Sequence, residues 1–382
     1  MPRTLLVDTN RAAVPIYRAL CGMGHDVWVV GGVPTETLAK LSRNYVQLDY
    51  SNADRLSDFV KARGFDYLVP GCTDVSYRVC SEIGEGIFPE IDKPGNTQAI
   101  HSKTEFRGTA IDLGLSVPRV LSLKEAVGVE AVIVKPVDSF SGRGITVLHA
   151  PGTDQLDAAF ELACRASRIG QAIVEEYVSG QLFSHSAFVW NGKVVADFVV
   201  QEDCTTNPFT VDTSRVASHF PTEMIESLRK DVCRLVSSLG LSNGLMHTQF
   251  IAEEGCYWII EVARRCPGDI YSLLIEFSTG YPYAASYAAP FIGKSPVPRG
   301  EDNIQERIIR HTVTSGNAVS LWGLRFTMPV HVRLFVPLAT SGDMIEPSPY
   351  GRVGIFFFRS PSDDEQEQLY RRLVDRELYS FS

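Results

Sequence analysis

The chain has 382 residues, 45% of them hydrophobic and 21% charged, with 36 basic and 45 acidic side chains and a formal net charge of −9. The hydrophobic content excludes a disordered chain, and the acidic balance argues against a nucleic-acid partner, because nucleic-acid binders carry a basic footprint. At roughly 100–200 residues per domain, the length predicts two or three domains.

The sequence predicts neither secretion nor membrane insertion. The N-terminus lacks the apolar segment of a signal peptide, and no apolar run is long enough to span a bilayer. The eight cysteines show no C-x-x-C spacing, which favours free thiols over disulfides or a structural zinc site. We therefore expect a cytoplasmic protein without a membrane partner.

Strands and helices alternate in the first 95 residues. Strands are predicted over residues 4–8, 26–30 and 65–70, and a helix over 53–63 precedes the third. This alternation predicts a parallel sheet with right-handed crossovers. The loop after the first strand, Thr9–Ala13, lacks the glycines of a dinucleotide-binding turn, so NAD binding is excluded. We interpret residues 1–95 as a Rossmann-like α/β lobe that is purely structural or that contributes to substrate binding through Gly71-Cys72-Thr73-Asp74.

From residue 96 the pattern becomes α+β. A helix carrying Lys103 and Arg107 runs to Gly114, and a helix over 222–239 ends at Gly240. A hairpin is predicted at Asn191-Gly192. The predicted strands cover residues 131–135, 145–148, 172–176, 186–190, 193–200, 247–252 and 257–262, and a further helix covers 154–168. We expect one domain over 96–295, with a small lobe over about 115–180.

The last part of the chain reads as a separate small unit. Residues 296–303 resemble a linker, and strands are predicted over 330–337 and 351–359. We assign residues 296–382 to a β-containing α+β unit that contributes to the acceptor pocket or to a homodimer contact.

A strand that ends in Lys135 leads into a glycine- and serine-rich loop, Pro136–Gly144. The backbone N–H groups of such a loop can close over phosphate oxygens, although no Walker A motif is present. A lysine and a flexible loop at a strand end are also common surface features, so this segment alone leaves phosphate binding open.

Two later segments carry polar side chains at strand ends. The strand that ends in Glu175-Glu176-Tyr177-Val178 can present backbone groups to a planar heterocycle, or it is an ordinary strand that leaves the core. If the strands around Gln249 and Glu261 pair, their oxygens can converge on Mg²⁺. Arg265 can neutralise a transferring phosphoryl group, or it forms a simple salt bridge with Glu261.

The order and spacing of these segments resemble the ATP-grasp superfamily, and in particular its carboxylate–amine ligases, over residues 1–295. The resemblance implies that ATP and Mg²⁺ are held between two α+β lobes. Lys103 and Lys135 would contact the phosphates, Arg265 would face the acyl phosphate, and Glu261 and Gln249 would hold the metal. The resemblance also implies a phosphate-covering loop of Ser139, Ser141, Gly142, Arg143 and Gly144, and an adenine site at Glu175, Glu176, Tyr177 and Val178.

The chain departs from the pattern of this family at three places. Gln249 stands where a carboxylate is usual, Ala263 stands where the family has a metal-binding Asn, and Gly180–Phe183 offers no acid for the ribose. Fewer anionic ligands weaken Mg²⁺ binding. Either Asp269 or Glu253 rebuilds the metal site, or activity is reduced.

The implied activity is the ATP-dependent joining of a carboxylate to an amine through an acyl phosphate, with release of ADP and phosphate. Small-molecule acids and amines, including amino acids, are the expected substrates. Candidate substrate contacts are the first lobe, His185 or His247, and Arg264 or Arg333. The alternatives are a non-catalytic ATP-binding relative, and a carboxylase-type or kinase-type enzyme.

Overall fold

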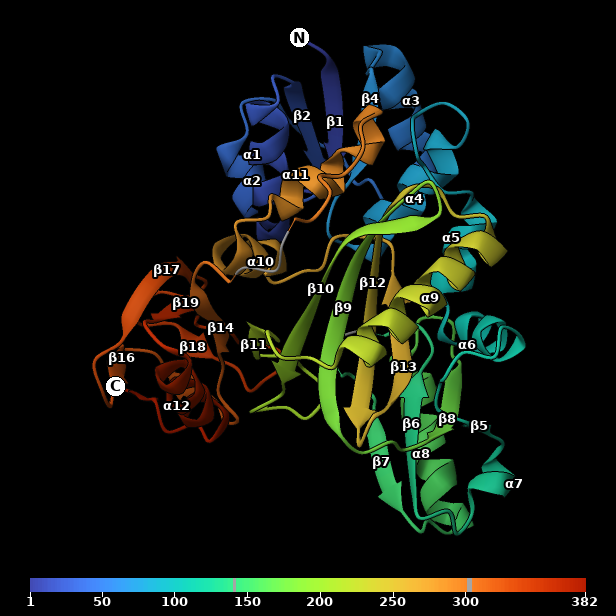
Figure 1. Cartoon of the computed structure of the whole chain (residues 1–382), viewed down its shortest axis with the longest axis vertical. Coiled ribbons are helices and arrows are strands. Elements are labelled where there is room, and N and C mark those ends of the chain that lie inside the picture. Colours follow the sequence, from blue (N-terminus) through green and yellow to red (C-terminus); the bar gives the residue numbers. More distant parts are fainter. Residues whose placement is uncertain (140–141, 301–303) are drawn as a thin grey trace.

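The computed structural model describes residues 1–139, 142–300 and 304–382. Figure 1 shows an N-terminal α/β lobe at the top, a small sheet with its helices at the lower right, and a large sheet that extends into the C-terminal residues at the left. The α/β and α+β character predicted from the sequence is confirmed.

The N-terminal lobe is built on a four-stranded parallel sheet of order β3-β2-β1-β4. Its strands are β1 (Arg3–Val7), β2 (Asp26–Gly31), β3 (Tyr45–Gln47) and β4 (Tyr67–Pro70). Its helices are η1 (Arg11–Ala13), α1 (Val14–Gly22), α2 (Thr37–Leu41), α3 (Ala53–Arg63) and α4 (Asp74–Gly84). The edge strand β3 was not predicted, because three residues carry too little periodicity.

Asp8 connects the loops at the carboxyl ends of β1 and β4 through hydrogen bonds. Its carboxylate accepts hydrogen bonds from the backbone N–H of Asn10 at 2.9 Å and of Cys72 at 2.8 Å. A Cβ on Gly71 would lie 2.1 Å from the Cβ of Asp8, so only glycine permits this approach. Burial raises the pKa of Asp8 to about 6. These contacts fix Arg11 and the segment 71–74 on the same side of the lobe.

A second sheet of four antiparallel strands follows, with the order β5-β8-β6-β7. It is reached through α5 (Pro94–His101) and α6 (Lys103–Asp112), and contains β5 (Val120–Leu121), β6 (Ala131–Pro136), β7 (Thr146–His149), β8 (Ala172–Glu176), α7 (Leu123–Ala126) and α8 (Thr153–Ala166). Leu156 and Ala163 of α8 share a buried cluster with Val132 and Val134 of β6, so the helix covers one face of the sheet.

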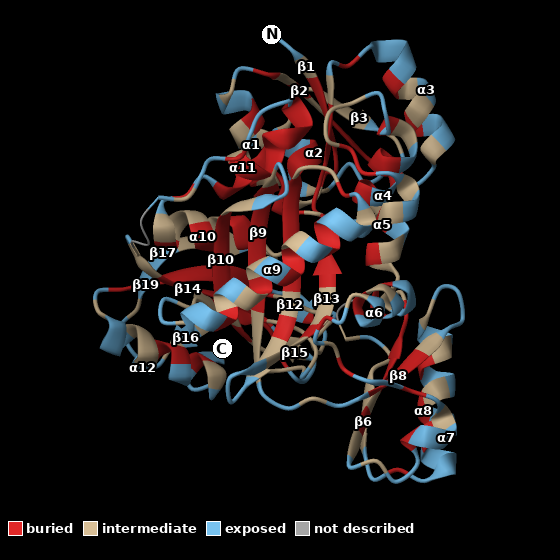
Figure 2. Ribbon diagram, turned by 45° about the vertical axis from the view of Figure 1, so that its right-hand side comes forward, coloured by how far each residue is buried: buried red, intermediate tan, exposed pale blue. Residues whose placement is uncertain are grey.

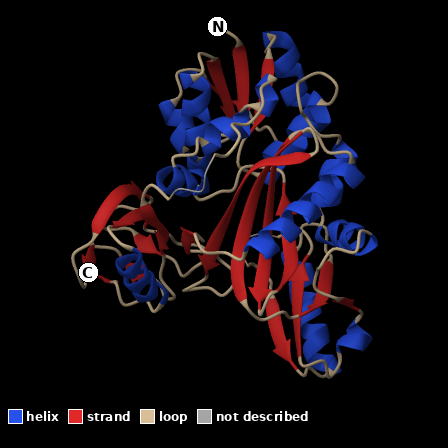
Figure 3. Cartoon of the chain, in the orientation of Figure 1, coloured by secondary structure: helices blue, strands red, loops and turns tan. Residues whose placement is uncertain are grey.

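The large sheet has eight strands in the order β13-β12-β9-β10-β11-β14-β19-β17, and it runs through the middle of the molecule (Figure 3). Its first part consists of β9 (Gln181–Trp190), β10 (Lys193–Asp203), β11 (Thr213–Val216), β12 (Gly244–Glu253) and β13 (Cys256–Ala263). Asn191 and Gly192 have φ of 51° and 75°, as the predicted hairpin turn requires. Helix α9 (Thr222–Leu239) ends at Gly240 as predicted, and it lies across the buried strands of this sheet (Figure 2).

The C-terminal residues extend this sheet instead of forming a detached unit. They supply β14 (Arg307–Val313), β17 (His331–Pro337) and β19 (Gly354–Ser360), and β14 pairs with β11. The remaining elements are two short strand pairs, β15 (Val319–Ser320) with β18 (Met344–Ile345) and β16 (Leu324–Phe326) with β20 (Tyr379–Phe381), and helix α12 (Asp363–Val374). The domain boundaries near residues 95 and 295 stay a prediction.

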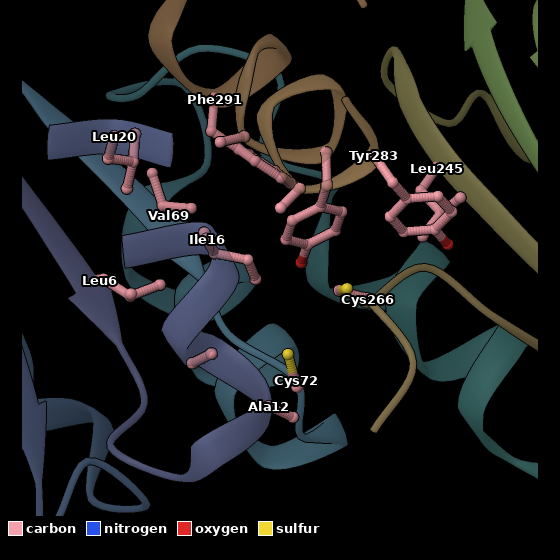
Figure 4. Packing of buried hydrophobic residues seen from close by; sticks show 14 of the residues in the cluster. Leu6, Ala12, Ile16, Leu20, Val69, Cys72, Leu245, Cys266, Tyr283 and Phe291 are labelled. Atoms are coloured by element: carbon pink, nitrogen blue, oxygen red, sulfur yellow. The ribbon is translucent and has the colours of Figure 1, made fainter. Parts of the chain in front are cut away.

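A single buried core joins the N-terminal lobe to the large sheet. Helices α10 (Tyr271–Thr279), α11 (Tyr283–Ala288) and η2 (Pro290–Ile292) follow β13. In Figure 4, Ile16 and Val69 of the first lobe belong to the same cluster as Tyr283 and Phe291. This packing holds the end of β13 beside the loops after β1 and β4. Within the described ranges, no helix has the length and apolarity needed to cross a bilayer.

Candidate active site

A buried ion cluster connects the small sheet to α6 and β13. The Nζ of Lys135 lies 2.5 Å from Oε2 of Glu175, and the Nε of Arg107 donates to Oε1 of Glu175 at 2.6 Å. Arg107 also donates to the backbone carbonyls of Ile259 and Ile260 at 3.0 and 3.2 Å. Burial opposes the ionisation of Glu175, but Lys135 and Arg107 outweigh it and lower the pKa of this carboxyl. Burial also lowers the pKa of Lys135, and two basic side chains therefore share one carboxylate.

A second, more open cluster lies next to the first. The Nζ of Lys103 is 3.6 Å from Oε2 of Glu261, whose side chain is 44% exposed. The Nε of Arg265 is 2.7 Å from Oδ1 of Asp74 in the N-terminal lobe. Burial opposes the charged form of Arg265, but Asp74 and Glu261 raise the pKa of its guanidinium. Glu261 pairs with Lys103 and Arg265 with Asp74, so a simple Glu261–Arg265 bridge is not what organises these side chains.

Gln249 and Glu261 are direct partners across β12 and β13, as the sequence analysis expected. The Nε2 of Gln249 donates to Oε2 of Glu202 at 2.8 Å, and the hydroxyl of Ser184 donates to Oε1 of Glu202 at 2.8 Å. Because the amide nitrogen of Gln249 is engaged, its carbonyl oxygen is the end that remains for a cation. Burial raises the pKa of Glu202. Glu202 thus places a carboxyl group directly behind the neutral Gln249.

The residues fit a magnesium site only in part. Among the described residues, no three His, Cys, Asp or Glu side chains gather closely enough to hold a metal by themselves. Glu261 and the carbonyl of Gln249 offer oxygen ligands, and Mg²⁺ commonly completes its shell with nucleotide phosphates and water. The proposed substitutes are engaged elsewhere: Glu253 accepts from the Ser179 hydroxyl at 3.0 Å, and Asp269 pairs with Arg352 at 3.0 Å. Besides Glu261, the acid in contact with Gln249 is Glu202.

The glycine-rich loop packs against another loop of the large sheet. Gly142 and Gly144 have φ of 70° and 72°, and a Cβ on Gly142 would lie 2.6 Å from the Cβ of Phe209. The Ser139 hydroxyl donates to the carbonyl of Arg143 at 2.8 Å, and the Nζ of Lys103 reaches the Ser139 carbonyl at 3.4 Å. Ser141 lies outside the described residues. That the loop covers phosphates stays a prediction.

The residues predicted to receive adenine do not all face one side. Glu176 is exposed on the face of β8 opposite Glu175, and it lies 3.3 Å from Arg119. The N–H of Tyr177 donates to the carbonyl of Ala131 at 3.0 Å. Val178 makes no backbone hydrogen bond within the described part of the chain, so its N–H and C=O are free for a heterocycle.

Two of the predicted substrate contacts are wrong. His185 is buried on the sheet face opposite Gln249, with its Nε2 2.9 Å from Asp197, and Arg229 of α9 closes over the same carboxylate. Arg264 is also buried, and its Nε donates to Asp92 at 2.8 Å. Both side chains hold elements together and have no access to a substrate.

His247 and Arg333 have different surroundings. His247 shares the face of Gln249, with its Nδ1 2.9 Å from the Ser186 hydroxyl. Burial and the charge of Arg265 lower the pKa of His247 to about 3, so its imidazole is neutral at physiological pH. Arg333 lies on β17, and its Nε is 3.4 Å from Oε2 of Glu306. Only His247 of these two lies near Arg265.

Two residues of the site, Arg107 and Glu202, were not predicted. A signal for Arg107 existed in its spacing from Lys103, because residues four apart share a helix face. Glu202 continues the alternation of buried Phe198 and Val200 on β10, which places it on the same sheet face.

Comparisons with known proteins agree with this geometry. Residues 129–272 match the ATP-grasp domain family. The chain is 38% identical over 94 residues to the cyanophycin synthetase of Synechocystis sp., a match that covers 22% of this chain and 10% of that protein. The matched relatives are thus far longer than the part that this chain covers.

Solved structures resemble the whole chain. The L-amino acid ligase from Bacillus licheniformis gives a TM-score of 0.80 at 17% identity, over 100% of this chain and 99% of that one. The phosphoribosylglycinamide synthetase from Anaerococcus prevotii gives a TM-score of 0.75 at 18% identity, with the same coverage of both chains. The chain therefore has the ATP-grasp fold. Because residues 129–272 also match the ATP-grasp domain family, the resemblance seen in the sequence is confirmed.

Proposed function

We propose that this chain is an ATP-dependent ligase that activates a carboxylate as an acyl phosphate and joins it to an amine, with release of ADP and phosphate. The observation that carries the proposal is the convergence of Lys103, Lys135, Glu261 and Arg265 at the junction of the small sheet, α6 and β13. Solved structures with the same fold include an enzyme described as an L-amino acid ligase, which supports an amino acid as one substrate.

In the first step, an oxygen of the substrate carboxylate attacks the γ-phosphorus of ATP. The bond from this phosphorus to the bridging oxygen breaks, and ADP leaves with the electron pair. Lys103 and Lys135 spread the negative charge that develops on the phosphoryl oxygens, which is the main catalytic contribution in phosphoryl transfer. Mg²⁺ bound at Glu261 and Gln249 would neutralise further phosphate charge.

In the second step, the amine nitrogen attacks the acyl carbon. The carbon–oxygen bond to phosphate breaks, phosphate leaves with the electron pair, and the nitrogen loses a proton. Arg265 contributes a fixed positive charge on the side of the N-terminal lobe, because Asp74 holds its guanidinium. A positioned guanidinium suits a carboxylate or phosphate because it can donate two parallel hydrogen bonds.

The test is incubation of the purified chain with ATP, Mg²⁺ and pools of amino acids, with ADP and phosphate measured separately. We expect ADP release that needs both an acid and an amine, and that falls at least about a hundredfold in Arg265→Ala, as for removal of a transition-state contact. The matched control is Arg359→Ala, because the side chain of Arg359 is exposed on β19 and pairs with Glu306. Release of AMP and pyrophosphate would contradict the acyl phosphate.

The depleted metal site favours a second candidate, a non-catalytic ATP-binding relative. Gln249 and Ala263 remove two metal ligands that the family resemblance implies, and Glu202 is buried behind Gln249. Calorimetry separates the two candidates. Tight binding of ATP without ADP release in any acid and amine mixture would support the non-catalytic protein.

A further inference from the structure

Asp269, which follows β13, forms ion pairs with Arg310 of β14 and with Arg352, which precedes β19. The Nη1 of Arg352 lies 3.0 Å from Oδ1 of Asp269, and the Nη2 of Arg310 lies 3.3 Å from Oδ2. The Nε of Arg310 also donates to the carbonyl of Asp269 at 2.8 Å. Asp269 and Ile270 have φ of 58° and 59°, a costly conformation for a β-branched residue. The arginines therefore hold Asp269 in a fixed and strained position.

Arg310 and Arg352 differ in how many of their guanidinium N–H groups make hydrogen bonds. Arg310 is buried and has further hydrogen bonds, one of them to the hydroxyl of Thr312 at 2.9 Å. The side chain of Arg352 is 28% exposed, and Asp269 contacts it through one nitrogen. The other N–H groups of Arg352 have no hydrogen-bond acceptor among the described residues.

A third arginine, Arg11, lies in the N-terminal lobe, where its neighbour Ala12 shares a buried cluster with Cys266, three residues before Asp269 (Figure 4). Arg11 follows β1 and is partly buried, yet its guanidinium has neither a hydrogen bond nor an ion pair within the described part of the chain. The charged groups that act on it are Arg352, Asp269 and Glu36. Asp269 is already shared by two arginines, and Glu36 accepts the hydroxyl of Thr9. Burial and Arg352 lower the pKa of Arg11, so the pair repels without a ligand.

Two guanidiniums from different lobes with unused N–H groups form a site that an oxyanion completes, because carboxylates and phosphates accept paired hydrogen bonds from arginine. We propose that Arg11 and Arg352 together bind a carboxylate or phosphate group of a substrate, separate from the carboxyl group that is activated. This inference rests on the proposed ligase function and narrows its substrates to an acid or an amine that carries an additional anionic group.

The experiment compares Arg352→Gln and Arg11→Gln with the wild-type chain, and uses Arg359→Gln as the matched control on β19. The acid probes are glutamate and glutamine, the amine probes are alanine and alaninamide, and inorganic phosphate is the third probe. Each is titrated by thermal shift, and KM is taken from ADP release. The pair of probes that responds identifies whether the acid, the amine or a phosphate group supplies the anion.

We expect both variants to bind the responding anionic probe about ten- to hundredfold more weakly, as for loss of a charged hydrogen bond, with its neutral counterpart unchanged. ATP affinity and the control should also be unchanged, and Arg352→Lys should recover part of the binding. Equal losses for charged and neutral probes, or no probe whose binding depends on Arg352, would overturn the inference.

The two proposals fail in different ways. If an anionic probe binds through Arg11 and Arg352 but no mixture releases ADP, the anion site stands and the ligase function is wrong. If ADP release is robust and indifferent to both arginines, the ligase function stands and the anion site is wrong.

Discussion

The two faces of β8 carry adjacent carboxylates in opposite environments. Glu175 is fully buried between Lys135 and Arg107, with contacts of 2.5 and 2.6 Å. Glu176 is exposed and lies 3.3 Å from Arg119, which is itself 62% exposed. Since successive side chains of a strand point to opposite faces of the sheet, one residue can face the protein interior while its neighbour faces water. The Glu-Glu pair therefore contains one residue that organises the interior and one that faces solvent.

A third carboxylate of the site, that of Glu202, is also buried. Glu202 is buried like Glu175, but its hydrogen-bond donors, Ser184 and Gln249, are neutral. The cations lower the pKa of Glu175, whereas burial raises the pKa of Glu202. Burial alone does not decide the charge of an acid in this site. The direct partners decide with it, and these are cations for Glu175 and neutral groups for Glu202.

The largest effect is expected from Glu175→Gln, which leaves Lys135 and Arg107 buried without their anion. We expect the free energy of unfolding to fall by about 3–5 kcal/mol, as for other buried ion pairs that lose one partner. Urea unfolding followed by circular dichroism measures the change. If Glu175→Gln unfolds no more easily than Glu176→Gln, the two faces of β8 do not differ as described.

Substitution of Lys103 in the second, more open cluster should lower the activity of the protein and leave its stability almost unchanged. Lys103 contacts Glu261 at 3.6 Å, and the pair is partly exposed. Lys103→Ala should lower ADP release about a hundredfold, because a charge near the phosphoryl group is lost, and change the unfolding free energy by less than about 1 kcal/mol. A variant that loses stability and activity together would place Lys103 with the buried cluster. Lys124→Ala, on α7, is the control for removal of a lysine.

Much of this site could be predicted from the sequence because its signals are local. The strand that ends in Lys135 and the hairpin of Gln249 with Glu261 follow from hydrophobic runs and a turn, and both are found. Helix 222–239 was also predicted with its closing Gly240. These features depend on residues close together in the chain.

The remainder depends on contacts between distant segments. Arg107 reaches Glu175 and Ile259, which are 68 and 152 residues away. Glu202 stands between Gln201 and Asp203, a polar run that suggests an exposed strand end, and only the order β12-β9-β10 places it near Gln249. Arg264 was misjudged for the same reason, because its partner Asp92 lies 172 residues away. Periodicity can assign such a residue to a face of its own helix or strand, but it does not identify the distant partner.

Glu202 allows a test of the effect of neutral partners on a buried carboxyl group. Its pKa is raised above 4.5, so the folded chain binds its proton more tightly than the unfolded chain does. The stability from this group is complete below the unfolded pKa, and is lost as the pH rises through the folded pKa. Relative to Glu202→Gln, the wild-type chain should therefore lose stability as the pH rises above 4.5, until Glu202 is ionised in the folded chain as well.

Urea unfolding of both proteins across this range measures the difference, with Glu253→Gln as the control because Glu253 is an exposed carboxylate at the β12–β13 turn. A difference that does not change with pH would mean that Glu202 titrates alike in both states. Saturating Mg²⁺ with an ATP analogue should reduce the dependence if the added cation favours the ionised carboxylate.

The smallest effect is expected on the outer face of β8. Glu176→Gln removes an exposed pair with Arg119, and exposed ion pairs contribute about 0–1 kcal/mol. The adenine site implied by the family resemblance includes Glu176, so ATP affinity is the sharper measurement. Because Glu176 lies opposite Glu175, we expect calorimetry to give an unchanged affinity. A severalfold loss of ATP affinity would show that adenine contacts the outer face of β8 as well, so that Glu175 and Glu176 both act on ATP.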